Sequence, residues 1–456
     1  MHAIYAKVIS ALYVLMRLFA RKPAKKIVFL SRQSFYPSED FKLLERALAG
    51  HLPDWRIDYA CYADTAQERG GFSRRIIWTI LQLARVASAR LCIVDGYCPA
   101  VAIPRLASTT VVVQLWHALG AFKRFAWQTL DSTEGRSRQA AETLAMHRNY
   151  DLVIAGGPGA VQPFSEAFAI PPECILPIGL PRLDLLLAMR GLPSTASSAT
   201  GRFASNLTDA SQHPSNPLAA KCLAARAIVK SRYPQLNTNR LKVLYAPTFH
   251  RQNDTSVINS STSQLIKALG DSCLLLISPH VLSQPPSSKP PKTLYQLAQT
   301  IQNAQFDHSA SPTDSVVWCQ EENNFALLAQ VDVLVTDYSA IALEAAAIGT
   351  RTLFYVPDIA TYRLDPGLNV DPQQLFPNLC FEDATALAKA LKSIPQADDT
   401  LPTPDAFQSF ARDYLVTPLA GATERIAQTI CARLNVSFTP TPSTSEKMPT
   451  KRGEKT

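Results

Sequence analysis

Residues 26–62 decide the fold class: KIVFLS (26–31) and WRIDYACY (55–62) are short apolar runs, and EDFKLLERALAG (39–50) between them has the pattern of a helix. A strand, a helix and a second strand in this order are typical of a βαβ unit. Strands that are buried on both faces of a parallel sheet are apolar throughout. This stretch therefore predicts a doubly wound α/β sheet.

The same alternation continues along the chain. Further apolar runs of the first half lie in ARLCIVDG (89–96), TTVVVQLW (109–116), YDLVIAGG (150–157) and ECILPIGLPRLD (173–184). A second series begins with RLKVLYAPTFH (240–250) and continues through CLLLISPH (273–280), DSVVWCQ (314–320), VDVLVTDYSAIALEAAAIG (331–349) and TRTLFYVPD (350–358). Each series predicts one Rossmann-like domain, and we expect the carboxyl ends of both sets of strands to face a central cleft.

Shifts in composition predict the domain limits. We expect an N-terminal Rossmann-like domain over residues 25–190 and a C-terminal one over residues 241–435. Residues 191–240 are rich in Ser, Thr, Ala, Pro and Asn, which favours a linker or a surface insertion. Residues 436–456 have little to bury and are expected to be disordered.

The N-terminal segment, residues 1–24, is predicted to be an amphipathic helix. Four apolar side chains fall on one side of that helix: Ile4, Val8, Leu12 and Leu15. The basic cluster between residues 21 and 26 would then lie against anionic lipid headgroups. The apolar stretch 8–15 is short for a bilayer span, so a membrane-spanning anchor is the less favoured interpretation. We therefore expect a peripheral contact with the cytoplasmic face of the cell membrane; the alternative is a surface helix that packs only on the domain.

Composition and charge restrict the class of protein. The chain has 456 residues, of which 47% are hydrophobic and 18% charged, so it can form two domains with sizeable cores. Its formal net charge of +8 indicates an anionic partner, such as an acidic substrate or a phospholipid surface. Nucleic acid is not expected, because the basic residues are spread out and no known binding module is present. The nine cysteines are single and lack zinc-site spacing, which predicts reduced thiols in the cytoplasm.

Polar residues follow three of the predicted strands, where a doubly wound fold binds its ligands. These residues are Trp116 and His117 after VVVQL, Pro247 and Thr248 after VLYA, and Ser278, Pro279 and His280 after LLLI. A histidine at a strand end is often only a structural residue that hydrogen-bonds within the core. Two of them at strand ends of different domains favour a shared catalytic site.

A fourth strand, within residues 331–349, delivers Asp337 and Ser339 to a turn before an alanine-rich helix that contains Glu344. Free backbone N–H groups and the helix dipole at such a turn attract a diphosphate. The other interpretation, which does not exclude the first, is that Asp337 and Ser339 cap the helix.

Taken in order, these motifs resemble the CDP-glycerol glycerophosphotransferase family, which builds teichoic-acid-like polymers. The resemblance covers about residues 110–430 and rests on QLWHALG (114–120) followed by KR (123–124), GLPRLD (179–184), VLYAPTFHR (243–251), SPH (278–280) and DVLVTDYSAIALEAAAIGTRTLFYVPDIATYRLDPGLNVD (332–371). It implies two Rossmann-like domains of the GT-B kind. It also implies a donor that is CDP-glycerol or a related CDP-alcohol, and a lipid-linked or polymer acceptor.

The resemblance also implies roles for individual residues. His117 and His280 match the two active-site histidines, and Arg182, Pro247, Thr248 and Ser339 match donor-site motifs. The sequence departs from the family pattern at Ala118, Ala340 and Glu344, which bears on the identity of the donor alcohol. The residues expected to bind substrate are Ala118, Lys123, Arg124, Arg182, Pro247, Thr248, Ser278, Asp337, Ser339, Ala340 and Glu344.

The implied reaction is attack of an acceptor hydroxyl on the β-phosphate of the CDP-alcohol, with CMP as the leaving group. His117 is the expected general base, because the pKa of histidine lies near 6.5. His280 and Arg182 are expected to stabilise the leaving phosphate, while Lys123 and Arg124 meet an anionic acceptor. No carboxylate cluster predicts a metal site or a required cofactor, although the site is compatible with Mg²⁺ carried on the diphosphate.

Two other functions are consistent with the same residues. A GT-B glycosyltransferase would use a nucleotide sugar, with Glu344 binding the ribose. A non-catalytic polyanion-binding protein would keep the fold and the basic surface, and it would bind polymer without releasing CMP.

Overall fold

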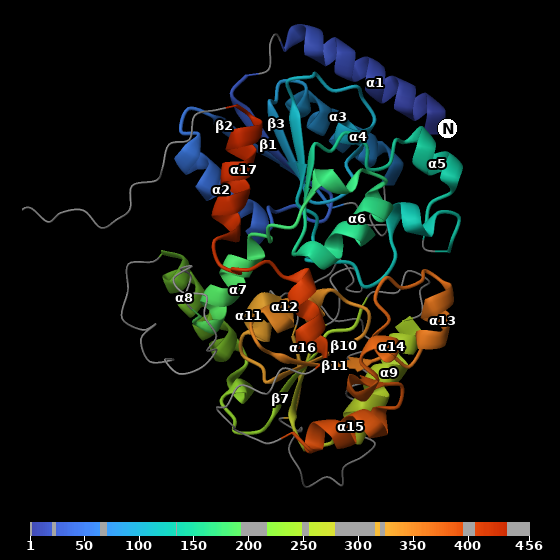
Figure 1. The fold of residues 1–456 in the computed structure, drawn as a ribbon, viewed down its shortest axis with the longest axis vertical. Helices are drawn as coiled ribbons and strands as arrows, with labels where there is room; N and C mark the ends of the chain where they lie inside the picture. Colours follow the sequence, from blue (N-terminus) through green and yellow to red (C-terminus); the bar gives the residue numbers. More distant parts are fainter. Residues whose placement is uncertain are drawn as a thin grey trace, which may run out of the picture.

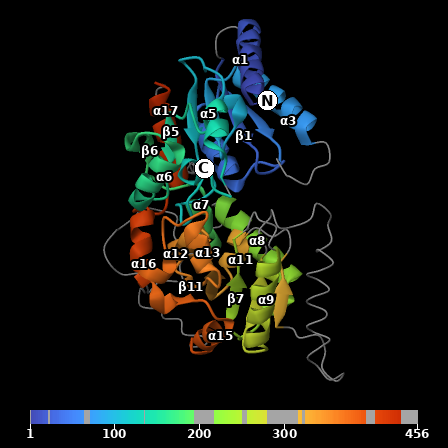
Figure 2. The same ribbon diagram turned by 90° about the vertical axis from the view of Figure 1, so that its right-hand side faces the viewer.

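A computed structural model describes residues 2–20, 24–63, 71–133, 135–192, 217–248, 255–278, 315–319, 324–394 and 406–435. The chain forms two α/β units, one above the other in Figure 1, and Figure 2 shows the same division from the side. His280, part of the 191–240 segment and the tail 436–456 lie outside the described residues, so the expectations for them stay predictions.

The first unit is built on a six-stranded parallel sheet in the order β2-β1-β3-β4-β5-β6. Its strands are β1 (Lys26–Ser31), β2 (Arg56–Cys61), β3 (Leu91–Val94), β4 (Val111–Gln114), β5 (Leu152–Ile154) and β6 (Ile175–Leu176). The central strands β1 and β3 are almost completely buried, as their uninterrupted apolar sequences predict.

The second unit has a second six-stranded parallel sheet in the order β12-β11-β10-β7-β8-β9. Its strands are β7 (Lys242–Tyr245), β8 (Leu274–Ile277), β9 (Val316–Trp318), β10 (Val333–Thr336), β11 (Arg351–Tyr355) and β12 (Cys380–Phe381). The prediction of two doubly wound sheets is confirmed.

Strand order reverses once in each sheet. In the first sheet the chain leaves β1 towards β2 and then returns to the other side of β1 as β3. In the second sheet it leaves β7 towards β8 and returns beside β7 as β10. Ligands of doubly wound sheets bind at such switch points, outside the carboxyl ends of the strands. Residues after β1, β3, β7 and β10 are therefore the first place to search for a site.

Helices cover the sheets of both units. In the first unit they are α1 (His2–Phe19), α2 (Glu39–His51), α3 (Gly71–Val86), α4 (Pro99–Ala102), α5 (Arg138–Thr143) and α6 (Val161–Phe168), with α7 (Arg182–Arg190) leading towards the second unit. The second unit has α8 (Pro217–Arg232), α9 (Thr255–Leu269), α11 (Asn324–Leu328), α12 (Ile341–Ala347), α13 (Ile359–Leu364), α14 (Pro372–Leu375), α15 (Ala384–Lys392) and α16 (Ala406–Ala411).

The predicted N-terminal helix is present as α1, and it lies along the first unit. Ile9 and Tyr13 are buried against that unit. The Tyr5 hydroxyl donates to Thr79 Oγ1 over 3.1 Å, and the Ala107 N–H donates to the Tyr13 hydroxyl over 3.0 Å. One face of α1 is therefore part of the fold.

The last helix, α17 (Ala422–Arg433), crosses back to the first unit, although residues 241–435 were expected to form one domain. It lies beside α2 in Figure 1, and the Glu424 carboxylate is 2.7 Å from His51 Nε2. The carboxylate of Asp184 on α7 accepts hydrogen bonds from the main-chain N–H groups of Gly421 and Thr423. The 191–240 segment also differs from a plain linker, because it contains α8.

An apolar contact joins the two units. Phe122, which follows β4, is buried and lies 6.2 Å from both Phe354 and Phe407 of the second unit, measured between ring centroids. The Phe122 carbonyl accepts hydrogen bonds from the N–H groups of Asn369 and Val370. The loop after β4 is therefore anchored in both units.

Candidate functional site

At the switch point of the second sheet, one carboxylate, that of Asp337, connects the ends of β7 and β10. Asp337, directly after β10, accepts a hydrogen bond from the Thr248 N–H over 2.8 Å and a second one from the Thr248 hydroxyl. Its Oδ1 also accepts from the Tyr338 N–H over 2.6 Å. Asp337 and Thr248 are both buried. The carboxylate therefore fixes the turn that contains Pro247 and Thr248 against the end of β10.

The turn after Asp337 leads directly into α12. Ser339 and Ala340 are half-buried, and Ser339 Oγ accepts from the Ile341 N–H over 3.4 Å. Ser278, at the end of β8, donates from its hydroxyl to Asn324 Oδ1 over 2.6 Å. The predicted donor residues of β7, β8 and β10 thus end at one edge of the second sheet, as its parallel strands require.

His117 lies at the corresponding edge of the first sheet, two residues beyond Leu115. Trp116 before it has a left-handed backbone (φ 58°), which is uncommon for an aromatic residue. The chain turns sharply there, and the Trp116 and His117 rings pack at 4.1 Å between centroids. Trp116 also stacks on Phe125 at 4.9 Å. The imidazole of His117 is therefore presented at the surface on an aromatic support.

The hydrogen bond of His117 fixes its tautomer. Its Nδ1 lies 3.2 Å from the main-chain carbonyl oxygen of Asp95, which can only accept. In the neutral ring Nδ1 then carries the hydrogen and Nε2 carries the lone pair. This is the form that a general base needs.

Asp95 follows β3 at the switch point of the first sheet. Its side chain is buried, and Oδ1 has no hydrogen-bond partner in the part of the chain that the structure describes. Burial raises the pKa of the Asp95 carboxyl to about 7, and the nearby Asp40 carboxylate acts in the same direction. Asp95 is not among the residues predicted from the sequence, although its position after LCIV resembles that of Asp337 after VLVT.

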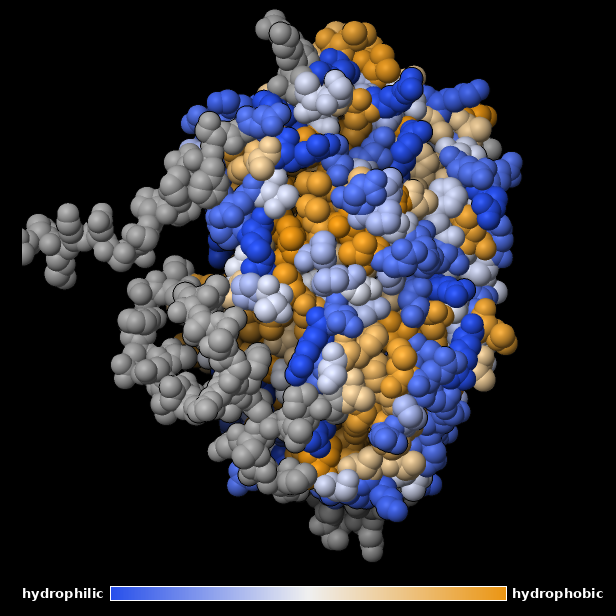
Figure 3. Space-filling model, in the orientation of Figure 1, coloured by the Kyte–Doolittle hydropathy of each residue, from blue (hydrophilic) through white to orange (hydrophobic). Residues whose placement is uncertain are grey.

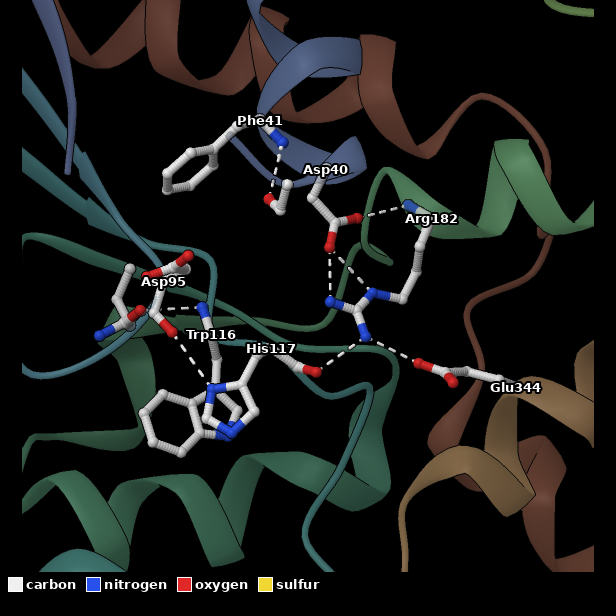
Figure 4. A network of polar contacts seen from close by, with 9 residues as sticks. Asp40, Phe41, Asp95, Trp116, His117, Arg182 and Glu344 are labelled. Carbon is white, nitrogen blue, oxygen red and sulfur yellow. Dashed lines mark hydrogen bonds and ion pairs between the residues drawn. The ribbon is translucent and has the colours of Figure 1, made fainter. Parts of the chain in front are cut away.

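Arg182 connects the two edges. Its guanidinium lies between Asp40 on α2 and Glu344 on α12, and it also donates to the main-chain carbonyl of His117 (Figure 4). All three side chains of this network are buried. Arg182 and Glu344 were predicted from the sequence as substrate ligands, whereas Asp40 was not predicted. Because protein groups already engage Arg182, its phosphate contact stays a prediction.

The cations expected to meet the acceptor lie where the loop after β4 reaches the second unit. Lys123 forms an isolated antiparallel bridge with Leu368, and the Arg124 N–H donates to the Gly367 carbonyl over 2.9 Å. The Arg124 side chain is exposed, while Lys123 and Ala118 are half-buried. Nothing in the structure tests their predicted contact with substrate.

A second histidine, His147, packs against Trp116, the residue before His117. His147 is buried, its ring lies 5.9 Å from that of Trp116, and its Nδ1 is 2.9 Å from the Tyr150 hydroxyl. Burial lowers the pKa of His147 to about 3, so the ring is neutral at physiological pH. Within the described ranges, no group of three or more His, Cys, Asp or Glu residues is arranged to hold a metal ion. The Mg²⁺ dependence of the reaction stays a prediction.

Comparison with known proteins gives a consistent result. The family model described as CDP-Glycerol:Poly(glycerophosphate) glycerophosphotransferase matches residues 12–195 and 221–432. The chain is 25% identical over 373 residues to a teichoic acid ribitol-phosphate primase of Bacillus spizizenii, and the match covers 80% of each chain. It is 24% identical over 353 residues to a teichoic acid glycerol-phosphate primase of the same organism, covering 76% of each.

A solved structure of the wall teichoic acid polymerase TagF has a similar fold. The TM-score is 0.60 at 16% identity, and the superposition covers 95% of each chain. At this identity the likeness supports the arrangement of the two sheets and not the role of any residue.

Proposed function

The chain belongs to the CDP-Glycerol:Poly(glycerophosphate) glycerophosphotransferase family, and we propose that it transfers glycerol phosphate or ribitol phosphate from a CDP-alcohol to a hydroxyl of a teichoic acid acceptor. The resemblance inferred from the sequence motifs is thus confirmed. One observation supports the proposed chemistry: Arg182 donates to the main-chain carbonyl of His117 and to Glu344, so the residue that carries the expected base is joined to α12, the helix that follows the turn with Ser339.

In the proposed step the acceptor oxygen attacks the β-phosphorus of the donor. A new P–O bond forms to the acceptor, the P–O bond to CMP breaks, and the hydroxyl proton passes to Nε2 of His117. A positioned base contributes about 10²–10⁴-fold to such a transfer. Nδ1 of His117 stays bonded to the Asp95 carbonyl, so the ring keeps its orientation while it takes the proton.

The leaving CMP gains negative charge, and fixed donors near its phosphate lower the barrier. We assign this role to two neighbouring turns, the one after β7 that carries Thr248 and the one after β10 that carries Ser339, together with His280 from the predicted motif. The two turns suit that role because the Asp337 carboxylate binds the N–H groups of Thr248 and Tyr338 and so ties one turn to the other before substrate arrives. Rigid donors cost no reorganisation during the reaction.

We further propose that the outer face of α1 contacts an anionic lipid surface. Opposite the packed face, Leu18 and Phe19 are 74% and 81% exposed, and Ile4 and Leu15 are also exposed. Figure 3 shows apolar surface at the top of the molecule, where Figure 1 places α1. Lys7 and Arg17 flank this apolar face and complement anionic headgroups.

The helix is long and apolar enough to cross a membrane by length and composition. Spanning would break the buried contacts of Ile9 and Tyr13 with the first unit, so a helix lying flat on the surface fits better. The nine cysteines are free thiols, which is typical of a cytoplasmic protein. We therefore place the enzyme peripherally on the cytoplasmic face of the cell membrane, where a lipid-linked acceptor would meet it.

The reaction is tested by measuring CMP release from CDP-glycerol and CDP-ribitol, with UDP-glucose as a third donor. Purified protein is incubated with membranes that carry teichoic acid acceptors. We expect CMP from at least one CDP-alcohol and no UDP from UDP-glucose. Release of UDP alone would favour a nucleotide-sugar glycosyltransferase, and silence with all three donors would favour a polyanion-binding protein.

A further inference from the structure

Protein groups surround the Arg182 guanidinium. Asp40 Oδ2 accepts from its Nε over 2.9 Å and also from its Nη2, and Asp40 Oδ1 accepts from the Arg182 main-chain N–H over 2.7 Å. Its Nη1 donates to the His117 carbonyl over 2.8 Å and to Glu344 Oε1 over 2.7 Å. Each of the three guanidinium nitrogens is therefore engaged by the protein.

The charges of this network are compatible with a permanent bridge. Burial acts to lower the pKa of Arg182, but Asp40 and Glu344 together raise it above its ordinary value, so the guanidinium stays charged. Burial raises the pKa of the Glu344 carboxyl, and the neighbouring Arg182 opposes that effect. A buried ion pair is retained only where its geometry and hydrogen bonds are good, and removal of one partner leaves an unpaired charge.

The bridge also connects the two switch points. Asp40 lies in the first turn of α2, the helix that follows β1, and α2 begins with Ser38 accepting from the Phe41 N–H. Glu344 lies on α12, five residues after Ser339. Figure 4 shows the Arg182 guanidinium between Asp40 and Glu344, with the main chain of His117 alongside.

We propose that Asp40, Arg182 and Glu344 form an interdomain bridge that holds the main chain of His117 in register with the donor turn, residues 337–340 between β10 and α12. Arg182 and Glu344 are then positioning residues, in place of the phosphate and ribose ligands expected from the sequence. This inference rests on the proposed transfer reaction. It also explains why the sequence departs from the family pattern at Glu344, because the glutamate side chain is long enough to contact Arg182.

Glu344→Gln separates this role from ligand binding. The glutamine keeps an oxygen at the same place but loses the charge, while the Asp40–Arg182 pair stays intact. A misplacement of about 1 Å at a reacting group costs about 10²-fold in rate. We therefore expect kcat to fall by about 10²-fold, with the Kd for the CDP-alcohol, measured by calorimetry, changed by less than about twofold, because Thr248 and Ser339 are untouched.

The matched control is Glu424→Gln. Glu424 also pairs across two elements, with His51 on α2, but it lies on α17 away from the strand ends. It should leave kcat and Kd unchanged, and both variants should show native circular dichroism. An unchanged kcat for Glu344→Gln would overturn the bridge, as would a Kd raised by about tenfold or more, which identifies Glu344 as a ligand.

Hydrogen exchange keeps the test independent of activity. If the wild type releases no CMP from either CDP-alcohol, the proposed function fails. The bridge is then tested by the hydrogen-exchange rates of the main-chain amides of residues 115–118 and 341–347. Faster exchange of both segments in Glu344→Gln supports the bridge, because each loses a restraint. Equal exchange in wild type and variant overturns it.

Discussion

Replacing Asp337 by Asn perturbs the donor turn with almost no change of shape. The carboxylate accepts three hydrogen bonds, two from Thr248 and one from Tyr338, and all three donors belong to buried residues. In asparagine one oxygen becomes an NH₂ group, which faces a donor whichever way the amide is turned. At least one buried donor then loses its ionised acceptor, which costs about 1.5–3 kcal/mol.

If that energy is expressed in the position of Thr248, the Kd for the CDP-alcohol rises by about 10–100-fold, since 1.4 kcal/mol corresponds to tenfold. Calorimetric titration with CDP-glycerol measures this directly, and urea unfolding measures the accompanying loss of stability. The control is Asp332→Asn at the other end of β10, where the carboxylate accepts from the Lys242 N–H over 2.8 Å. Donor affinity within about twofold of wild type in Asp337→Asn, or an equal loss in both variants, would refute the reasoning.

Three further outcomes are expected. The pKa of His147 is about 6.5 in the unfolded chain and about 3 in the folded protein, so its contribution to stability is present above pH 6.5 and is lost as the pH falls. The unfolding free energy of wild type relative to His147→Phe should therefore drop by about 2 kcal/mol between pH 7 and pH 5. A difference that stays constant with pH would contradict the burial of a neutral His147. A Cβ at Gly157 would lie 2.4 Å from the main chain of Leu415, so Gly157→Ala should lower the melting temperature. Gly50 has open space around it, so Gly50→Ala should not lower the melting temperature. Equal melting temperatures of the two variants would be inconsistent with the close approach at Gly157. Leu18→Asp on the outer face of α1 should weaken the affinity for phosphatidylglycerol vesicles, measured by co-sedimentation, by about tenfold or more. Leu223→Asp, at an exposed leucine on α8, should leave that affinity unchanged. Equal vesicle binding by the two variants would exclude α1 as the membrane contact.

The sequence was sufficient to predict elements with a strong local pattern. The apolar strands of both sheets and the helix that became α1 follow from runs of residues that need no knowledge of distant parts. His117, Thr248 and Ser339 were found for the same reason, since each directly follows such a strand. Parallel strands bring Thr248 and Ser339 together at one edge of the second sheet, while His117 lies at the corresponding edge of the first.

The missing parts depend on contacts between distant segments. Asp95 lies at the switch point because β3 returns beside β1, and a local sequence pattern does not predict the order of strands in a sheet. Asp40 is 142 positions from Arg182, so no spacing rule could pair them. The return of α17 to the first unit, where it packs on α2 and Asp184 binds its first residues, likewise consists of tertiary contacts.

The most direct test of the central claim is CMP release by His117→Gln compared with wild type. Glutamine can still donate to the Asp95 carbonyl, but it cannot take the proton of the acceptor hydroxyl. The account predicts a loss of about 10²–10⁴-fold in kcat with donor affinity preserved. A folded variant that keeps activity within about tenfold of wild type would show that His117 is not the base.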